Sequence, residues 1–248
     1  DVRELKIYQN LIQYIKNSII LVLAKKLYKK SDVIISNSKD GKKYIEKHCK
    51  TKVFNIPSPS LTEKLKPHFR KKSKPLKVLT VGRLSKEKGI ETIILAMKNL
   101  NFKNFSLTII GNGPEKNELK KLIKKLDLTK KVFLLGYKNN LKKYYKESNL
   151  YINASHFEGF CNSIVEAINY NNPIICTNCP GGNKEITLNG RGGEYFPINN
   201  YNILASKINQ FYKNPSTLVK KLFEAKKNIK NYSVSNHVYK FDKIFKNL

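Results

Sequence analysis

From residue 76 onward, short apolar runs of strand length alternate with helical segments, and this regular alternation constrains the fold most strongly. One helical segment is especially clear, because Leu119, Leu122, Ile123 and Leu126 recur at helical spacing after Pro114. Nearly apolar strands joined by crossover helices predict a parallel sheet covered on both faces. We therefore predict an α/β fold with a Rossmann-like parallel sheet. Its expected strands are Leu76–Gly82, Phe105–Gly111, Val132–Tyr137, Leu150–Ser155, Pro173–Thr177 and Gly193–Phe196.

Composition and periodicity divide the chain into four parts. Residues 57–75 are rich in Pro and Lys and lack periodicity, which predicts a linker before the sheet domain at 76–198. Residues 199–248 are expected to form two or three lysine-rich amphipathic helices. Residues 1–56 offer only two strands, so they are expected to be an incomplete remnant that packs on something else, and Asp1 in place of Met suggests a fragment or processed chain. The remnant's predicted elements are a helix, a strand, a helix and a strand at Leu5–Lys30, Asp32–Ser36, Lys39–Lys47 and Lys52–Ile56.

The net charge of +30 and the pI of about 9.9 first indicate an anionic partner: nucleic acid, a phospholipid surface or a phosphorylated ligand. Lysine is abundant throughout, however, so most lysines are expected to lie on solvated helix faces. Nucleic acid is not an expected partner, because interleaved aromatic motifs and a recognition-helix pattern are lacking.

The four cysteines do not form a disulfide framework, so reduced thiols in a cytoplasmic protein are expected. Cys176 and Cys179 have C-x-x-C spacing, but no second pair or histidine cluster supplies the other ligands that zinc needs, so no metal is expected. The apolar run Ile19–Ala24 is too short to span a bilayer and is not followed by a signal-peptide cleavage pattern.

In a doubly wound sheet, ligands bind in the loops at the carboxyl ends of strands. After the first expected strand, Gly82 permits close backbone approach, while Arg83 and Lys88 flank a tight loop before Gly89 opens a helix. Two cations beside a helix N-terminus make a suitable diphosphate clamp, although they are also simply two of 48 basic residues.

Three further loops carry weaker signals. Gly111-Asn112-Gly113 lacks the third glycine of a dinucleotide fingerprint, which disfavours NAD binding and favours a tight turn. Tyr137, after the third strand, is placed to lie beside a nucleotide base. The glycine-rich loop Pro180–Ile186 either lines the site with its amides or is a plain connection.

The strongest signal is the run His156–Ala167, which carries Glu158 in a Glu-Gly-Phe turn and Glu166 eight positions later. A helix is expected to begin there, capped by Asn162 or Ser163, with free N–H groups able to hold a phosphate. Glu166 would lie about one turn inside, where a carboxylate can accept hydrogen bonds from two adjacent sugar hydroxyls. Glutamates in first-turn and surface positions are common, so the pair is informative only in this strand–loop–helix context.

As an ordered set, these motifs resemble the carboxyl-terminal donor-binding domain of the retaining glycosyltransferases of family 4, which have the GT-B fold. The resemblance extends from about Leu76 to Phe196, and Asp32–Ser38 resembles the end of the family's amino-terminal domain. The matching segments are Val81–Leu84 with Glu87–Gly89, Ile110–Pro114, Phe133–Tyr137, Ser155 and Glu158–Phe160 with Glu166–Ala167, Pro173–Ile175, and Gly181-Gly182 with Glu185–Ile186.

The resemblance implies a nucleotide-sugar donor, most often a UDP-sugar, bound in a cleft between two Rossmann-like domains. Residues 1–56 would then be an incomplete second Rossmann-like domain on the acceptor side. Retaining transfer in this family is leaving-group assisted and needs no divalent metal, so no cofactor is expected. Glu158, which would contact the transferred sugar, and Arg83 and Lys88, which would neutralise the diphosphate, are the implied catalytic residues. The implied donor-binding residues are Gly82, Arg83, Lys88, Tyr137, Gly159, Phe160, Cys161, Asn162 and Glu166, the last of these on the ribose hydroxyls.

The expected function is sugar transfer with retention to a glycan or lipid-linked acceptor, in bacterial-type surface polysaccharide or glycoconjugate synthesis. The expected location is the cytoplasm, with peripheral contact to anionic lipid at the inner face of the membrane. Most of the amino-terminal half of the family pattern is absent, and Cys161 stands where small residues such as glycine are usual. The alternatives are a non-catalytic nucleotide-sugar-binding fragment and, less favoured, a basic nucleic-acid-binding protein.

Overall fold

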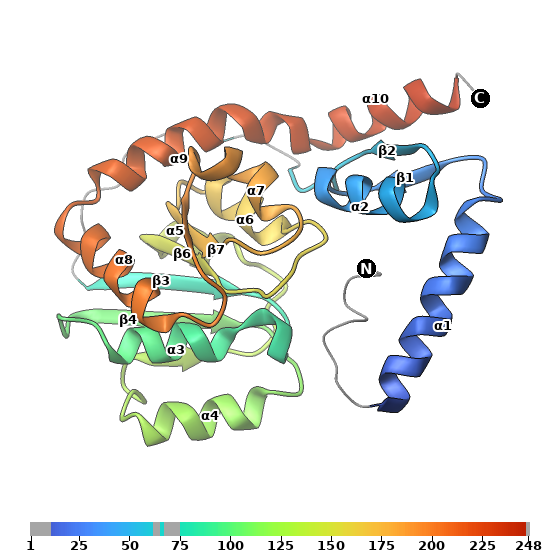
Figure 1. Ribbon diagram of the computed structural model, residues 1–248. Helices are drawn as coiled ribbons and strands as arrows, with labels where there is room; N and C mark the ends of the chain where they lie inside the picture. The colour runs from blue at the N-terminus through green and yellow to red at the C-terminus, as the bar shows by residue number, and fades with distance from the viewer. Residues whose placement is uncertain (1–10, 62–64, 67–74, 247–248) are drawn as a thin grey trace.

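The described part of the chain forms two separate parallel sheets (Figure 1). The structure is a computed structural model that describes residues 11–61, 65–66 and 75–246. The larger sheet has the strand order β5-β4-β3-β6-β7-β8, and the smaller one pairs β1 with β2. Every neighbouring pair is parallel, so the predicted α/β fold with a Rossmann-like sheet is confirmed.

The strands of the larger sheet lie within the predicted segments. All six predicted strands were too long, by one to three residues. The largest difference is at β5, which ends at Leu134 rather than Tyr137, because Gly136 adopts a φ of 69° and turns the chain out of the strand direction. The observed bounds are β3 Leu76–Val81, β4 Phe105–Ile110, β5 Val132–Leu134, β6 Leu150–Asn153, β7 Ile174–Thr177 and β8 Glu194–Phe196.

Helices cover both faces of this sheet, because successive strand residues point to opposite sides. Val78 and Ile152 pack into one buried cluster, and their neighbours Leu79 and Tyr151 pack into the other. The first cluster is completed by α3 (Ile90–Lys98), α4 (Lys116–Lys125) and α8 (Tyr201–Lys213). The second is completed by α5 (Lys142–Glu147), α6 (Asn162–Asn169), α7 (Asn183–Ile186), α9 (Ser216–Asn228) and the short helix η4 (Ile229–Tyr232).

The amino-terminal region has the predicted order of elements around the smaller sheet. They are α1 (Leu11–Tyr28), β1 (Ile34–Ser36), α2 (Lys39–Cys49) and β2 (Val53–Asn55). Ser38 caps α2 by accepting a hydrogen bond from the N–H of Gly41. The first residues of the predicted opening helix lie outside the described residues, and the interpretation as the remnant of a second domain stays a prediction.

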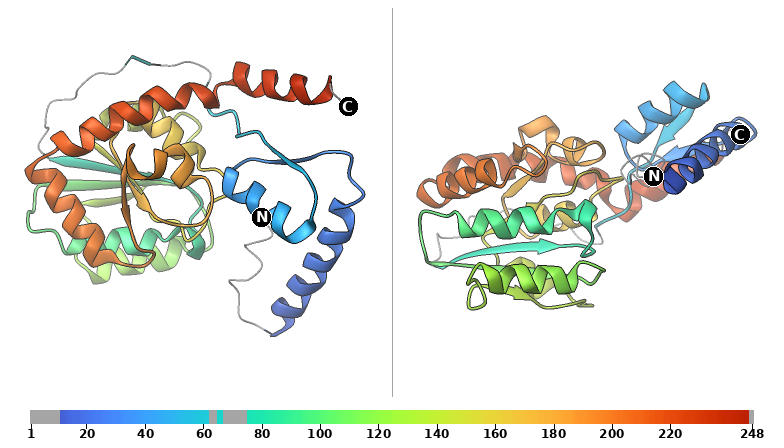
Figure 2. Two further views of the ribbon diagram at one scale, coloured as in Figure 1. Left: turned by 45° about the horizontal axis from the view of Figure 1, so that its top comes forward. Right: turned by 60° about the horizontal axis from the view of Figure 1, so that its bottom comes forward.

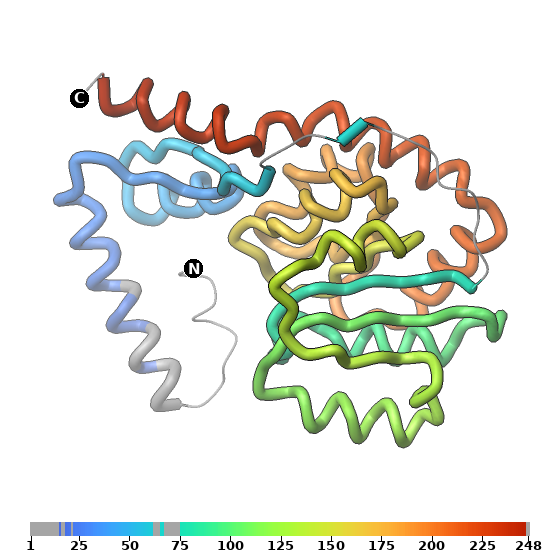
Figure 3. The backbone as a smooth tube through the Cα atoms, turned by 180° about the vertical axis from the view of Figure 1, so that it is seen from behind, coloured from blue at the N-terminus to red at the C-terminus, as the bar shows by residue number. Residues whose placement is uncertain are grey.

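The segment after β2 packs on the carboxyl-terminal helices. Leu61 is buried and pairs with Ser233 in an isolated β-bridge, and the N–H groups of Ser60 and Leu61 donate to the carbonyl of Tyr232. From there α10 (Val234–Phe245) extends from the larger sheet toward the smaller one, as Figures 1 and 2 show and Figure 3 repeats from behind. Part of the predicted linker is therefore packed, although residues 62–64 and 67–74 lie outside the described residues.

A buried lysine joins α9 to the end of α6. The last carbonyls of a helix have no partner within it, and Lys226 Nζ donates to two of them, Ile168 O at 3.4 Å and Asn169 O at 2.9 Å. The Lys226 side chain is only 1% exposed, so water cannot substitute for it.

Replacing Lys226 by Met should lower the free energy of unfolding by about 2 kcal/mol, because Asn169 O and Ile168 O lose a buried donor, although Ile168 O keeps the N–H of Asn171. Urea unfolding followed by circular dichroism measures this change. Lys227→Met is the matched control: this neighbour is exposed and forms a surface ion pair with Glu224, so its change should stay within about 0.5 kcal/mol. Equal losses in the two variants would contradict this role of Lys226.

Candidate functional site

The strand order places the candidate site at the centre of the larger sheet. Order along the chain reverses between β3 and β6, which creates the switch point at which open parallel sheets bind ligands. The loop beginning at Gly82 leaves β3, and the loop containing Glu158 leaves β6. Two of the loops singled out in the sequence therefore meet at the expected place.

At this point Lys88 and Glu158 form an ion pair. Lys88 Nζ lies 2.8 Å from Glu158 Oε1, which also accepts hydrogen bonds from Ser155 Oγ at 2.6 Å and Asn153 Nδ2 at 3.3 Å. Burial alone would lower the pKa of Lys88, but the adjacent carboxylate of Glu158 outweighs it and the pKa is raised. Lys88 is thus a fixed cation at neutral pH.

The backbone around Glu158 is held by the loop after β7. The backbone N–H of Glu158 donates to Pro180 O at 3.0 Å. Gly181 has a φ of 116°, and any side chain there would collide with the Glu158 carbonyl. The N–H of Gly181 in turn donates to Asp40 Oδ2 at 2.7 Å, and Glu185 Oε2 accepts from the N–H of Lys39 at 2.8 Å. The start of α2 therefore docks onto the loop after β7 and onto α7, next to the loop that carries Glu158.

The start of α6 differs from the prediction. The helix begins at Asn162 with Cys161 as its N-cap residue and no side-chain capping bond, so capping by Asn162 or Ser163 was wrong. Tertiary contacts take both side chains: Asn162 Oδ1 accepts from Ser60 Oγ at 2.9 Å, and Ser163 Oγ bonds the Tyr151 hydroxyl at 2.7 Å. The first N–H groups of α6 consequently have no side-chain cap, a geometry that suits an anion.

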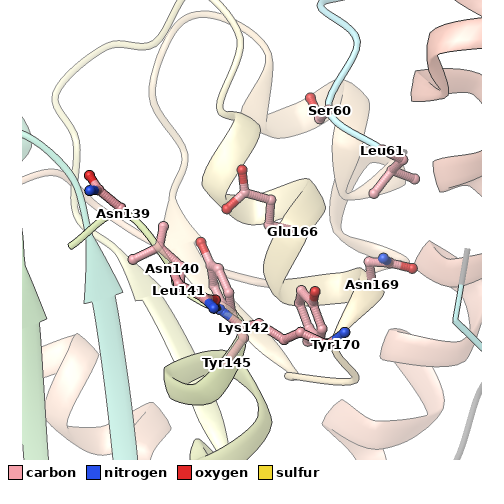
Figure 4. A pocket seen from close by; sticks show the side chains of 10 residues that line it. All are labelled: Ser60, Leu61, Asn139, Asn140, Leu141, Lys142, Tyr145, Glu166, Asn169 and Tyr170. Atoms are coloured by element: carbon pink, nitrogen blue, oxygen red, sulfur yellow. Dashed lines mark hydrogen bonds between the residues drawn. The ribbon is translucent and has the colours of Figure 1, made fainter. Parts of the chain in front are cut away.

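Glu166, the fifth residue of α6, faces a pocket of about 460 Å³ between α5, α6 and the segment after β2 (Figure 4). Burial raises the pKa of its carboxyl, and the hydroxyl of Tyr145 opposes that rise. Polar side chains make up most of the lining of the pocket, together with the aromatic rings of Tyr145 and Tyr170. Its lining residues are Ser60, Leu61, Asn139, Asn140, Leu141, Lys142, Tyr145, Glu166, Asn169 and Tyr170.

The remaining predicted residues surround these two features. Phe160 and Cys161 are buried at the start of α6, with Gly159 beside the side chain of Asn37, and burial raises the pKa of the Cys161 thiol. Arg83, after Gly82, is exposed, and Tyr137 is 71% exposed and does not line the Glu166 pocket.

Sequence reasoning missed Ser60, Asn140 and Tyr145, which line the pocket with Glu166. No local motif marks them, because they reach the pocket only through the tertiary approach of α5 and the segment after β2. All four cysteines are free and buried. Within the described ranges, no cluster of three or more His, Cys, Asp or Glu side chains could hold a metal ion, and the absence of a metal requirement stays a prediction.

Fold and site define an α/β protein with a cation, a partly buried carboxylate and a helix start without a side-chain cap near one sheet edge. The chain belongs to the glycosyl transferases group 1 family, whose sequence profile matches residues 62–234. The assignment to glycosyltransferases is thereby confirmed, whereas the narrower family 4 stays a prediction.

Two glycosyltransferases are similar in sequence to most of this chain. An uncharacterised glycosyltransferase of Methanocaldococcus jannaschii is 35% identical over 184 residues, which is 68% of this chain and 45% of that protein. In Campylobacter jejuni, N-acetylgalactosamine-N,N'-diacetylbacillosaminyl-diphospho-undecaprenol 4-alpha-N-acetylgalactosaminyltransferase is 30% identical over 233 residues, which is 86% of this chain and 63% of that protein. The chain thus spans about half to two thirds of the length of these relatives.

Solved structures confirm the GT-B type of fold. TarM of S. aureus superposes with a TM-score of 0.79 at 22% identity, over 93% of this chain and 46% of TarM. HepE of Anabaena superposes with a TM-score of 0.77 at 20% identity, over 92% of this chain and 67% of HepE.

Proposed function

We propose that the chain supplies the donor-binding side of a glycosyltransferase that transfers a sugar, with retention, from a UDP-sugar to a glycan or lipid-linked acceptor. The observation that carries the proposal is the position of the Lys88–Glu158 pair and the Glu166 pocket at the same carboxyl edge of one parallel sheet. A cation and a carboxylate in that arrangement suit the diphosphate and the ribose hydroxyls of a nucleoside diphosphate sugar.

In this proposal each group meets one part of the donor. Arg83, Lys88 and the uncapped N–H groups at the start of α6 neutralise the diphosphate as it leaves, which is where negative charge develops. Glu166 accepts hydrogen bonds from the ribose hydroxyls. Glu158, held by Lys88, Ser155 and Asn153, contacts the transferred sugar. Because fixed protein charges stabilise the leaving group, the proposed reaction requires no metal or cofactor.

Similar proteins support the UDP-sugar and the acceptor class. The pneumococcal O-GlcNAc transferase GtfA was crystallised with UDP and GlcNAc, and HepE with UDP and glucose. The name of the Campylobacter jejuni relative gives a diphospho-undecaprenol acceptor. Synthesis of a surface polysaccharide or glycoconjugate by this chain is inferred from these similarities.

A non-catalytic nucleotide-sugar-binding protein is the second candidate. Like the first candidate, it would hold the donor with the Lys88–Glu158 pair and the Glu166 pocket. The two candidates differ in transfer, whereas both require donor binding.

Replacing Glu166 by Ala should weaken UDP binding about tenfold, since two charge-assisted hydrogen bonds to ribose are lost. Isothermal titration calorimetry with UDP, UDP-GlcNAc, UDP-Gal and GDP-mannose measures this and ranks the donors. Glu118→Ala is the control, because Glu118 is an exposed residue of α4 that pairs with Lys121. This variant should bind UDP as tightly as the unaltered protein does.

If no donor binds the unaltered chain, both candidates are excluded. Donor binding without donor hydrolysis or transfer would favour the non-catalytic protein. Strongly salt-dependent binding to random DNA, in the absence of donor binding, would instead support a nucleic-acid-binding protein.

We also propose that the protein works at the cytoplasmic face of the membrane, in peripheral contact with anionic lipid. Helix α1 exposes apolar side chains, among them Ile19, Leu23 and Leu27, and ends with the exposed Lys25 and Lys26 in its last turn. Over the described part of the chain, no helix has the length and apolarity needed to cross a membrane. Apolar side chains next to lysines suit insertion at an anionic surface.

The protein should co-sediment with phosphatidylglycerol vesicles at low salt and dissociate as salt rises, because screening weakens the attraction of its lysines. Leu23→Asp should reduce this binding severalfold, and Ile203→Asp, at an exposed apolar position of α8, should not. Absence of vesicle binding at every salt concentration would contradict the membrane proposal.

A further inference from the structure

Tyr145 is a buried tyrosine whose ring is fixed on several sides. It lies on α5, is 1% exposed, and stacks on Tyr170 with ring centroids 5.5 Å apart and planes within 3°. The ring of Tyr151 lies 6.0 Å away on another side. Packing of this kind leaves the hydroxyl one direction in which to point.

That direction is toward Glu166. Figure 4 shows the Tyr145 hydroxyl pointing toward the carboxylate of Glu166, which projects from α6. The hydroxyl also lies 3.4 Å from Ser163 O, at the long end of the hydrogen-bond range, so this carbonyl is a weak competitor for its single proton. A carboxylate is the stronger acceptor of the two, because its bond is charge-assisted.

The hydroxyl also affects the charge on Glu166. Burial raises the pKa of this carboxyl, and hydrogen bonding from Tyr145 lowers it again. The other titratable side chains that line the pocket are Lys142 and Tyr170, and Tyr151 lies behind Tyr145. Among these described groups, Tyr145 is the one whose hydrogen bond favours ionised Glu166.

We propose that Tyr145 is a positioning residue whose hydroxyl orients the Glu166 carboxylate for two adjacent ribose hydroxyls. The inference rests on the proposed function of Glu166 and extends it to nucleotide selection. An oriented, ionised carboxylate can accept from two vicinal hydroxyls at once, whereas a protonated or rotated one cannot. Tyr145 thereby makes the site selective for ribonucleotides.

The first test needs no ligand. In protein labelled with ¹³C at glutamate carboxyls, the Glu166 signal, assigned with Glu166→Gln, is titrated in the unaltered protein and in Tyr145→Phe. This substitution keeps the packed ring and removes only the hydroxyl. Since the hydroxyl lowers the pKa of Glu166, its removal should raise that pKa, so the carboxyl takes up its proton at higher pH.

Tyr195→Phe is the matched control. It also removes one tyrosine hydroxyl, but this hydroxyl belongs to the edge strand β8 and bonds Thr187 Oγ1 at 2.6 Å rather than Glu166. Its Glu166 titration should equal that of the unaltered protein. Identical Glu166 titrations in all three proteins would overturn the role of Tyr145, whether or not the protein binds a nucleotide.

The second test compares UDP with 2′,3′-dideoxy-UDP. Tyr145→Phe should weaken UDP about tenfold and the dideoxy compound less than about twofold, since the lost bond acts through ribose hydroxyls. On acidification, UDP affinity should fall at a higher pH in the variant than in the unaltered protein. Equal weakening of both ligands would indicate a purely structural role and overturn the proposal.

Comparing the two nucleotides separates a failure of the function proposed for Glu166 from a failure of the role proposed for Tyr145. If the unaltered protein binds UDP and dideoxy-UDP equally, the assignment of ribose to Glu166 fails, and the nucleotide-selection role of Tyr145 fails with it. If the unaltered protein discriminates between them and Tyr145→Phe discriminates equally well, the function of Glu166 stands and the positioning role of Tyr145 is refuted.

Discussion

The ion pair between Lys88 and Glu158 is the interaction on which the site depends. It joins the loop after β3 to the loop after β6, the two strands between which the sheet order reverses. Its Glu158 partner is 8% exposed and accepts two further hydrogen bonds, so the pair is desolvated yet satisfied. Removing either partner would leave a charge with fewer partners in a place that water reaches poorly.

Around this pair, segments distant in the sequence fix one another. Because Gly181 has no side chain, the Glu158 carbonyl can lie close to its backbone. The N–H of Gly181 donates to Asp40, which links helix α2, beside the smaller sheet, to the site. On the other side, α6 carries Glu166 and is bound at its carboxyl end by Lys226 from α9. The loop of Glu158 is therefore held by the loop after β7, and the helix that supplies Glu166 is held at its carboxyl end.

The parallel sheet and the two loops that form its ligand edge were predictable, because strand and helix periods are local and ligand loops follow from parallel topology. Lys88, Glu158 and Glu166 were singled out for that reason. The cap of α6 was predicted wrongly, since Asn162 and Ser163 bond distant partners instead of their own helix. Tyr145 was missed because its approach to Glu166 depends on how α5 packs, which no local pattern in a lysine-rich helix reveals.

Isothermal titration of UDP and a UDP-sugar with Lys88→Met and Glu158→Gln tests the assignment of the pair most directly. If Lys88 meets the diphosphate and Glu158 the sugar, Lys88→Met should weaken both ligands about tenfold. Glu158→Gln should leave UDP binding as strong or stronger, because Lys88 loses a competing carboxylate, and should weaken the UDP-sugar. Equal effects of the two substitutions on UDP, or none from Lys88→Met, would contradict this account of the site.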